Sequence, residues 1–186
     1  MIMSCQTPEI AAQKAGRSES TLLERASAFA AEKHRGQAGK RPEEPYIQHI
    51  DNVVKLLLPH AATSETIAAA YLHDCLEKTD TTITELLRHF GEEVTELVYW
   101  LTDPEDSVGT EKELLCAWLL GRAPIAAKLI KLADIIDNGE AIRSHEPYKL
   151  VDFRRSKRAI LDRMVAVEGP AFAQRALYKA AMDVTR

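Results

Sequence analysis

Apolar residues recur with helical spacing along most of the chain, and this periodicity constrains the fold more than any other feature of the sequence. Leu22, Ala26, Phe29 and Ala30, for example, fall on one face of a helix. No segment has the alternation of apolar and polar residues that is typical of a half-buried strand. The sequence therefore predicts an all-α fold, a single helical bundle.

Capping and helix-breaking residues divide this pattern into separate helices. Thr21 and Glu24 have the spacing of a capping box, which predicts that the first helix begins there. Residues 36–45 hold two Gly, two Pro and several charged residues, so they are expected to form a loop. Pro124 and Gly139 are expected to begin and to end one helix. The helices expected after the loop cover approximately residues 51–58, 65–76, 82–91, 94–101, 110–119, 124–138, 150–167 and 170–184.

The length and composition fit one globular domain. The chain has 186 residues, of which 46% are apolar and 28% are charged. Residues 1–19 mix small and polar types and are expected to form a flexible N-terminal arm, followed by one domain over residues 20–186. No apolar run is long enough for a signal peptide or for a membrane span.

The charge and the cysteines exclude several classes of protein. The net charge of −4 gives no basic surface for polymeric nucleic acid, whereas a small anionic ligand needs only a local basic cluster. Cys5, Cys75 and Cys116 are far apart and form no CxxC pair, which argues against a disulfide framework and a Cys-rich zinc site. We therefore expect a cytoplasmic protein that does not bind membranes. The oligomeric state stays open, and a homo-oligomer is one of the alternatives.

An adjacent His-Asp pair is the first sign of chemistry. His73 and Asp74 follow an apolar stretch, and Glu77 lies four residues after His73, so all three are expected to line one side of a helix. An imidazole, a ligand carboxylate and a free carboxylate make a credible site for metal-activated water. A helix-end cap with a solvated acid is an equally good explanation of the pair taken alone.

Two further segments favour a metal site. His49 follows a Pro-Tyr-Ile-Gln sequence that leads into a helix, although it can also be read as an exposed histidine beside a loop. Asp134 lies inside an apolar helix, where an unpaired carboxylate is costly, so a salt bridge to Lys131 or Arg143 is the alternative to a metal. Asn138, one turn later, has the alternative of a helix C-cap.

Together these motifs resemble the HD-type hydrolase domain of the RelA/SpoT alarmone enzymes and of the small alarmone hydrolases. Because several motifs occur in the family's order over roughly residues 20–140, the resemblance is far more specific than an HD pair alone. It rests on His34-Arg-Gly-Gln37, Glu44-Pro-Tyr-Ile-Gln-His49, His73-Asp-x-x-Glu77, Thr79-Asp-Thr-Thr82, Phe90-Gly91, Leu101-Thr102 and Lys131-Leu-Ala-Asp134 with Asn138.

The resemblance implies a metal site with four protein ligands: His49, His73, Asp74 and Asp134. Two imidazoles and two carboxylates suit a transition metal of intermediate softness. The family usually uses Mn²⁺, which we expect here, with Fe²⁺, Zn²⁺ and Mg²⁺ as alternatives. His34, which precedes the loop, is expected to support the loop rather than to bind the metal.

The resemblance also implies roles around the metal. Glu77 is expected to position the attacking water or take its proton. Lys40 and Arg41 match an Arg-Lys pair that contacts the guanine nucleotide, although their order is reversed here, and solvated loop charges are the alternative. Asn138 is expected to bind the sugar or phosphate. Lys78 stands where the family has Asp, and we expect it either to clamp a phosphate or to weaken catalysis.

The implied function is metal-dependent hydrolysis of a nucleotide phosphate or pyrophosphate ester, with guanosine-3′,5′-bis(diphosphate) 3′-pyrophosphohydrolase activity as the preferred case. Its partner would be a small anionic nucleotide substrate. The departures from the family at Lys78, Ile135 and Asp137 leave two alternatives open. One is a phosphatase acting on another nucleotide, such as NADPH or a nucleoside monophosphate. The other is a non-catalytic nucleotide-binding protein that retains the HD fold.

Overall fold

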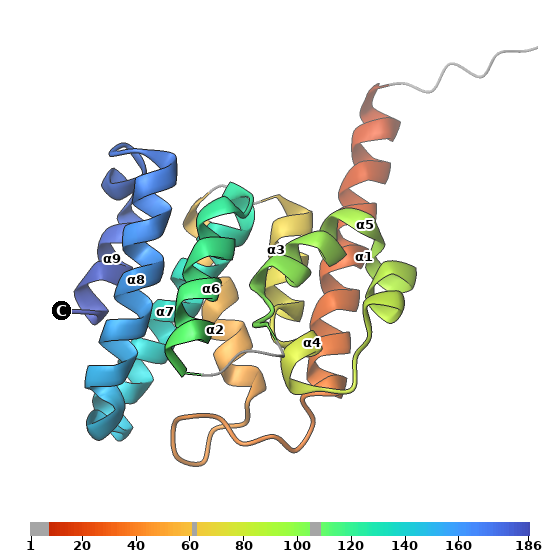
Figure 1. Ribbon diagram of the computed structural model, residues 1–186. Helices are drawn as coiled ribbons and strands as arrows, with labels where there is room; N and C mark the ends of the chain where they lie inside the picture. Colours follow the sequence, from red (N-terminus) through yellow and green to blue (C-terminus); the bar gives the residue numbers. More distant parts are fainter. Residues whose placement is uncertain (1–7, 61–62, 105–108) are drawn as a thin grey trace, which may run out of the picture.

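The computed structural model describes the backbone of residues 8–60, 63–104 and 109–186, with side chains from residue 21 onward in these ranges. Within them the chain is almost entirely helical, and its β pairing is an isolated bridge between Ala38 and Pro45 in the predicted loop. The all-α prediction is confirmed. The helices, labelled in Figure 1, are α1 (Pro8–Lys33), α2 (Ile47–Leu57), α3 (Ser64–Leu72), α4 (Cys75–Lys78), α5 (Ile83–Leu101), α6 (Gly109–Arg122), α7 (Ile125–His145), α8 (Leu150–Glu168) and α9 (Ala176–Val184).

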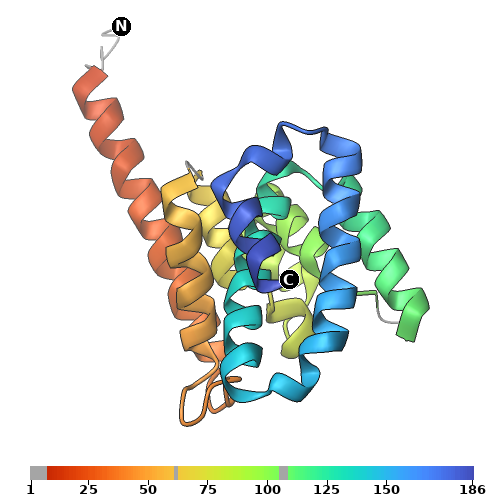
Figure 2. The same cartoon turned by 90° about the vertical axis from the view of Figure 1, so that its left-hand side faces the viewer.

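Helix α7 lies in the middle of the bundle. Every residue from 127 to 139 is buried, so this helix is covered on all sides, unlike an amphipathic surface helix. It packs against α2 on one side and against α8 and α9 on another (Figures 1 and 2). Polar side chains on such a helix face other protein groups, which makes Asp134, Asp137 and Asn138 unusual.

Helix α1 begins earlier than the capping pattern predicts. It starts at Pro8, so Thr21 lies inside the helix and the predicted start at Thr21 is wrong. Proline is tolerated in the first turn of a helix, and no later residue before Thr21 breaks it. Residues 8–19, which we expected to be an arm, therefore have a helical backbone that extends past the other helices (Figure 2). Residues 1–7 of the expected arm lie outside the described residues.

Two glycines act differently, although both were expected to end helices. Gly91 has a φ of 82° and breaks the direction of α5, in agreement with the two separate helices predicted there. Gly139 does not end α7, which continues to His145. A Cβ atom at Gly139 would lie 2.8 Å from the Val184 Cβ and 3.2 Å from a Phe153 ring carbon. This glycine therefore serves close packing of α7 against α8 and α9.

The termini of the central helices follow local chemistry. The Thr82 hydroxyl accepts a hydrogen bond from the Glu85 backbone N–H at 3.2 Å and so caps the start of α5. Pro124 is the N-cap residue of α7 rather than its first residue. None of the helices in the described ranges has an apolar stretch of the length needed to cross a membrane.

Candidate metal centre

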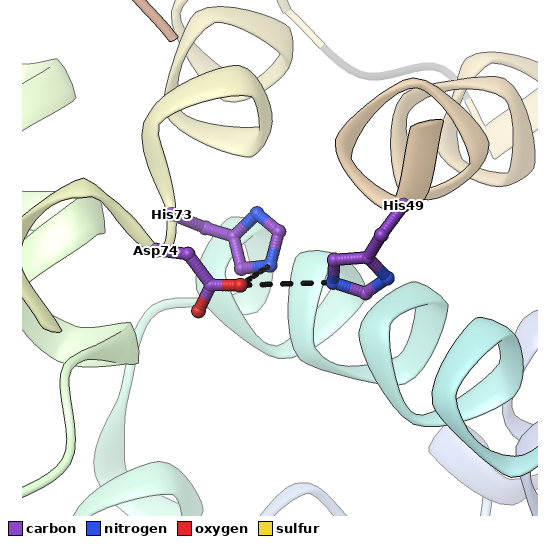
Figure 3. Close-up of side chains that lie close together, drawn as sticks. All are labelled: His49, His73 and Asp74. Atoms are coloured by element: carbon purple, nitrogen blue, oxygen red, sulfur yellow. Dashed lines mark ion pairs between the residues drawn. The ribbon is translucent and has the colours of Figure 1, made fainter. Parts of the chain in front are cut away.

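Four side chains from three parts of the fold meet beside α7. His49 comes from α2, His73 and Asp74 follow α3, and Asp134 comes from α7. The His49 Nε2 lies 3.6 Å from Asp74 Oδ2 and 3.4 Å from Asp134 Oδ1. The His73 Nε2 lies 3.3 Å from Asp74 Oδ2 and 3.9 Å from Asp134 Oδ1. The two rings and the Asp74 carboxylate converge over α7 (Figure 3).

A break in the helix brings His73 and Asp74 to the same point. The sequence pattern predicts one helix over residues 65–76, but α3 ends at Leu72 and the short α4 begins at Cys75. Asp74, between them, has φ −101° and ψ −1°, at the edge of the right-handed helical region. This break replaces the expected continuous helix, and it lets two consecutive side chains approach one position.

The two imidazoles each leave one nitrogen free in a buried position. His73 Nδ1 lies 2.7 Å from the Ala70 carbonyl oxygen, which can only accept, so Nδ1 carries the proton. His49 Nδ1 lies 2.7 Å from Asp137 Oδ2 and donates in the same way. Both Nε2 atoms are buried and have no hydrogen-bond partner among the described residues. Two inward-facing Nε2 atoms beside two carboxylates fit a divalent cation, which would take the place of any proton on them.

Asp137 supports the candidate metal site, a role that the sequence does not predict. In the sequence it stands out only as a departure from the family pattern. It holds His49 on one side and receives the Arg41 guanidinium on the other, with NH2 at 2.7 Å from Oδ1. Asn52 also donates to it at 3.0 Å. Burial raises the pKa of its carboxyl, but these donors outweigh burial and lower the pKa to about 2. The sequence feature that points to this role is an acidic residue three positions after Asp134 on an otherwise apolar helix.

The sequence left two alternatives for Asp134, a salt bridge and a place at the metal site, and the structure is compatible with both. Its Oδ2 pairs with the Lys131 Nζ at 3.0 Å, while its Oδ1 faces the two imidazoles. Burial opposes ionisation, yet the Lys131 ammonium and the His49 ring hold the pKa of Asp134 well below its usual range. Asn138 donates from Nδ2 to Asp134 Oδ1, so it orients this carboxylate and is not a C-cap. Arg143 instead donates to the Asp183 carbonyl oxygen.

Lys78 reaches the centre, whereas the Glu77 carboxylate contacts the Asp103 backbone. The Lys78 Nζ donates to Asp74 Oδ2 at 2.8 Å and also to the Tyr46 hydroxyl. Lys78, four residues after Asp74, therefore points toward the metal-facing side. Glu77 is exposed, and its Oε2 accepts the Asp103 backbone N–H at 3.3 Å.

The loop over residues 36–45 covers one side of the centre. Lys40 donates to Asn138 Oδ1, and Arg41 binds Asp137, so both loop cations contact α7. His34 supports the start of this loop, since its Nδ1 lies 2.9 Å from Gln37 Oε1. Gln37 in turn donates to the Lys78 carbonyl oxygen at 2.9 Å. Hydrogen bonds therefore connect the first half of the loop to α7 and to the Lys78 backbone.

Comparisons with known proteins identify the family. A family model described as an HD domain matches residues 26–166. The chain belongs to the HD domain family. HD domain proteins of this type are metal-dependent phosphohydrolases, so the protein is an enzyme of that class and the non-catalytic alternative falls away.

Named relatives of this HD domain include hydrolases from animals and bacteria. The chain is 40% identical to a human protein named guanosine-3′,5′-bis(diphosphate) 3′-pyrophosphohydrolase MESH1, over 124 residues that cover 65% of this chain and 69% of the relative. An Aquifex aeolicus (strain VF5) protein named guanosine-3′,5′-bis(diphosphate) 3′-pyrophosphohydrolase is 38% identical over 62% of this chain, but only 17% of that longer protein is covered. A solved structure of a metazoan orthologue of SpoT, described as hydrolysing ppGpp, superposes with a TM-score of 0.77. It is 26% identical and covers 88% of this chain and 93% of its own.

Proposed function

We propose that this HD domain enzyme is a guanosine-3′,5′-bis(diphosphate) 3′-pyrophosphohydrolase whose metal ligands are His49, His73, Asp74 and Asp134. The observation that carries the proposal is the pair of buried, unpartnered Nε2 atoms that face two carboxylates. The names of the human and Aquifex relatives support the substrate. In the reaction, water would replace the ribose 3′-oxygen on phosphorus, which gives GDP and pyrophosphate.

The metal that we propose is Mn²⁺. Two imidazoles and two carboxylates suit Mn²⁺, Fe²⁺ or Zn²⁺ better than a purely oxygen-binding ion. A divalent cation bound by these ligands would supply Lewis acidity, which acidifies a water and polarises a phosphate oxygen.

The residues around this centre would bind the substrate and move its protons. Glu77, which is exposed to solvent, would position the attacking water or accept its proton. Lys78 has three N–H donors, of which Asp74 and Tyr46 take two, so one remains for a phosphate oxygen. Lys40 and Asn138, which are hydrogen-bonded to each other, would contact the sugar or a phosphate. Arg41 would combine substrate contact with its bond to Asp137.

Metal analysis and a hydrolysis assay test this proposal together. Protein loaded with Mn²⁺ should retain about one ion per chain and release GDP and pyrophosphate from guanosine 3′,5′-bis(diphosphate). His73→Ala and Asp134→Ala should each lose the ion while the far-ultraviolet circular dichroism stays helical. His145→Ala is the matched control, because this histidine is exposed at the end of α7. Retention of the ion by both ligand variants would refute the ligand assignment.

Lys78 favours a second candidate, hydrolysis of another phosphorylated nucleotide such as NADPH or a nucleoside monophosphate. An ammonium occupies the position where the resembling family has a carboxylate, so the preferred phosphate geometry can differ. Lys78→Asp should then reduce activity on the alternative nucleotide and raise it on the bis(diphosphate), while Lys78→Arg keeps the charge as a control. If Lys78→Asp leaves both activities unchanged, Lys78 has no role in substrate choice.

A further inference from the structure

Helix α8 carries a lysine on the side that faces the protein core. Phe153, Ile160, Leu161 and Met164 are its buried residues, and Lys157 falls among them at helical spacing, four residues after Phe153 and three before Ile160. Its side chain is only partly exposed. A leucine would be the ordinary choice at such a position, because burying an unpaired ammonium is costly.

Lys157 has no anionic partner that explains this position. Throughout the described ranges, no carboxylate lies within ion-pair distance of its Nζ. The two nearby acids are already taken, since Asp103 pairs with Lys112 at 3.1 Å and Asp134 pairs with Lys131 at 3.0 Å. Burial and the Lys131 charge lower the pKa of Lys157, so Lys131 acts as a neighbouring cation rather than a partner.

A second cation on α8 is also without an ion-pair partner among the described residues. Arg154 lies three residues before Lys157 and therefore close to it around the helix. Its Nε is buried and has no hydrogen-bond partner in the described part of the chain. By contrast, Arg158 on another side of α8 donates to Asp162 at 3.2 Å in the ordinary manner of a surface helix. Arg163 also has a buried, unpartnered Nε, but its side chain packs against Gly121 of α6. Lys157 and Arg154 are therefore the two cations without an ion pair that lie on or next to the core-facing side of α8 in the described residues.

This charge lies on the opposite side of the metal centre from the loop cations. Along α7, Lys131 precedes Asp134 by three residues, and Asn138, which binds Lys40, follows it by four. At ~1.5 Å per residue, the two cationic positions are anchored about 10 Å apart along the helix axis. Phe153 of α8 packs against Gly139, and Glu168 at the other end of α8 pairs with Lys128, so α8 runs antiparallel to α7. Lys157, one turn after Phe153, therefore lies on the Lys131 side of Gly139. A ligand with anionic groups at both ends would meet cations at each.

We propose that Lys157, together with Lys131, forms a second phosphate-binding subsite, which holds the phosphate group of the substrate that is not hydrolysed. This inference rests on the proposed function, because it assumes a nucleotide with two separated phosphate groups. The bound phosphate supplies the anion that Lys157 lacks in the protein itself. Lys157 is therefore a residue that determines specificity for doubly phosphorylated nucleotides, and it takes no part in bond cleavage.

Kinetics with two matched nucleotides test the subsite. Guanosine 3′,5′-bis(diphosphate) is compared with guanosine 3′-diphosphate, which lacks the 5′ group. Lys157→Met, of similar length but uncharged, should lower kcat/KM for the first nucleotide roughly 10- to 100-fold, mainly through KM, and leave the second nearly unchanged. Lys157→Arg should restore most of the loss. Arg158→Met removes a charge from the same helix and should behave like the unaltered enzyme. An equal loss on both nucleotides would overturn the proposal.

A binding measurement separates this proposal from the proposed function. In metal-free protein, inorganic pyrophosphate should raise the Tm of the unaltered chain and of Arg158→Met, and it should raise that of Lys157→Met much less. If neither guanosine nucleotide is hydrolysed but this difference holds, the proposed activity fails and the subsite stands. If pyrophosphate raises all three Tm values equally, the subsite is wrong whatever the enzyme hydrolyses.

Discussion

Asp137→Asn should weaken metal binding without unfolding the protein. Asp137 is nearly fully buried, and it touches no candidate metal position itself but holds His49 through Nδ1 at 2.7 Å. Asparagine keeps the shape and one acceptor oxygen, so His49 keeps its tautomer, but the negative charge that makes its Nε2 more basic is lost. Residues that hydrogen-bond to metal-binding histidines typically contribute 10- to 100-fold in metal affinity. Because the acceptor remains, we expect about tenfold, or about 1.4 kcal/mol.

Competition between the protein and a fluorescent chelator measures this affinity for Mn²⁺ and Zn²⁺. Circular dichroism before and after metal loading shows whether the helices persist. Glu140→Gln is the matched control, since it neutralises an exposed acid on the same helix only three residues away. Asp137→Ala removes the acceptor as well and should lose about 100-fold. An affinity of Asp137→Asn within twofold of the unaltered protein would refute the argument that Asp137 tunes His49.

Three further results are expected. Burial lowers the pKa of His49, but the neighbouring Asp134, Asp137 and Asp74 carboxylates raise it to about 10 in the metal-free protein. A proton must therefore leave His49 when the metal binds, so the apparent metal affinity measured between pH 7 and 9 should rise with pH, and a flat profile would contradict this. Gly139→Ala should lower the free energy of unfolding by about 1–2 kcal/mol, because the clash with Val184 outweighs the gain in helix propensity. An unchanged or higher Tm in thermal denaturation would contradict this. Replacing both Lys40 and Arg41 with Ala should raise KM more than it lowers kcat in steady-state assays, and an unchanged KM would show that the two cations hold the loop to α7 without binding substrate.

Local chemistry explains why several features could be predicted from the sequence. The helical spacing of apolar residues requires only that one face be buried, so it predicts an all-α fold in any tertiary arrangement. Thr82 caps α5 and Gly91 breaks it because hydrogen bonding to the next turn and a positive φ depend on neighbouring residues alone. The four candidate metal ligands also followed from the sequence, since each lies in a short motif with recognisable neighbours.

Other features depend on residues that are distant in the sequence. Gly139 resembles a helix end when only α7 is considered, and its packing role follows from α8 and α9 lying against it. Asp137 has no motif of its own, and its role exists only because α2 brings His49 to within 2.7 Å of it.

Lys157 shows most clearly which properties follow from the sequence and which depend on the tertiary structure. The sequence by itself determined which residues can bind a metal and that the chain forms helices, because these depend on side-chain chemistry and local backbone preferences. Only the tertiary structure decided which acids are already paired, at Asp103 and Asp134, and therefore which cation is left without a partner. Pairing and desolvation depend on the distances between helices, and a one-dimensional pattern does not contain those distances.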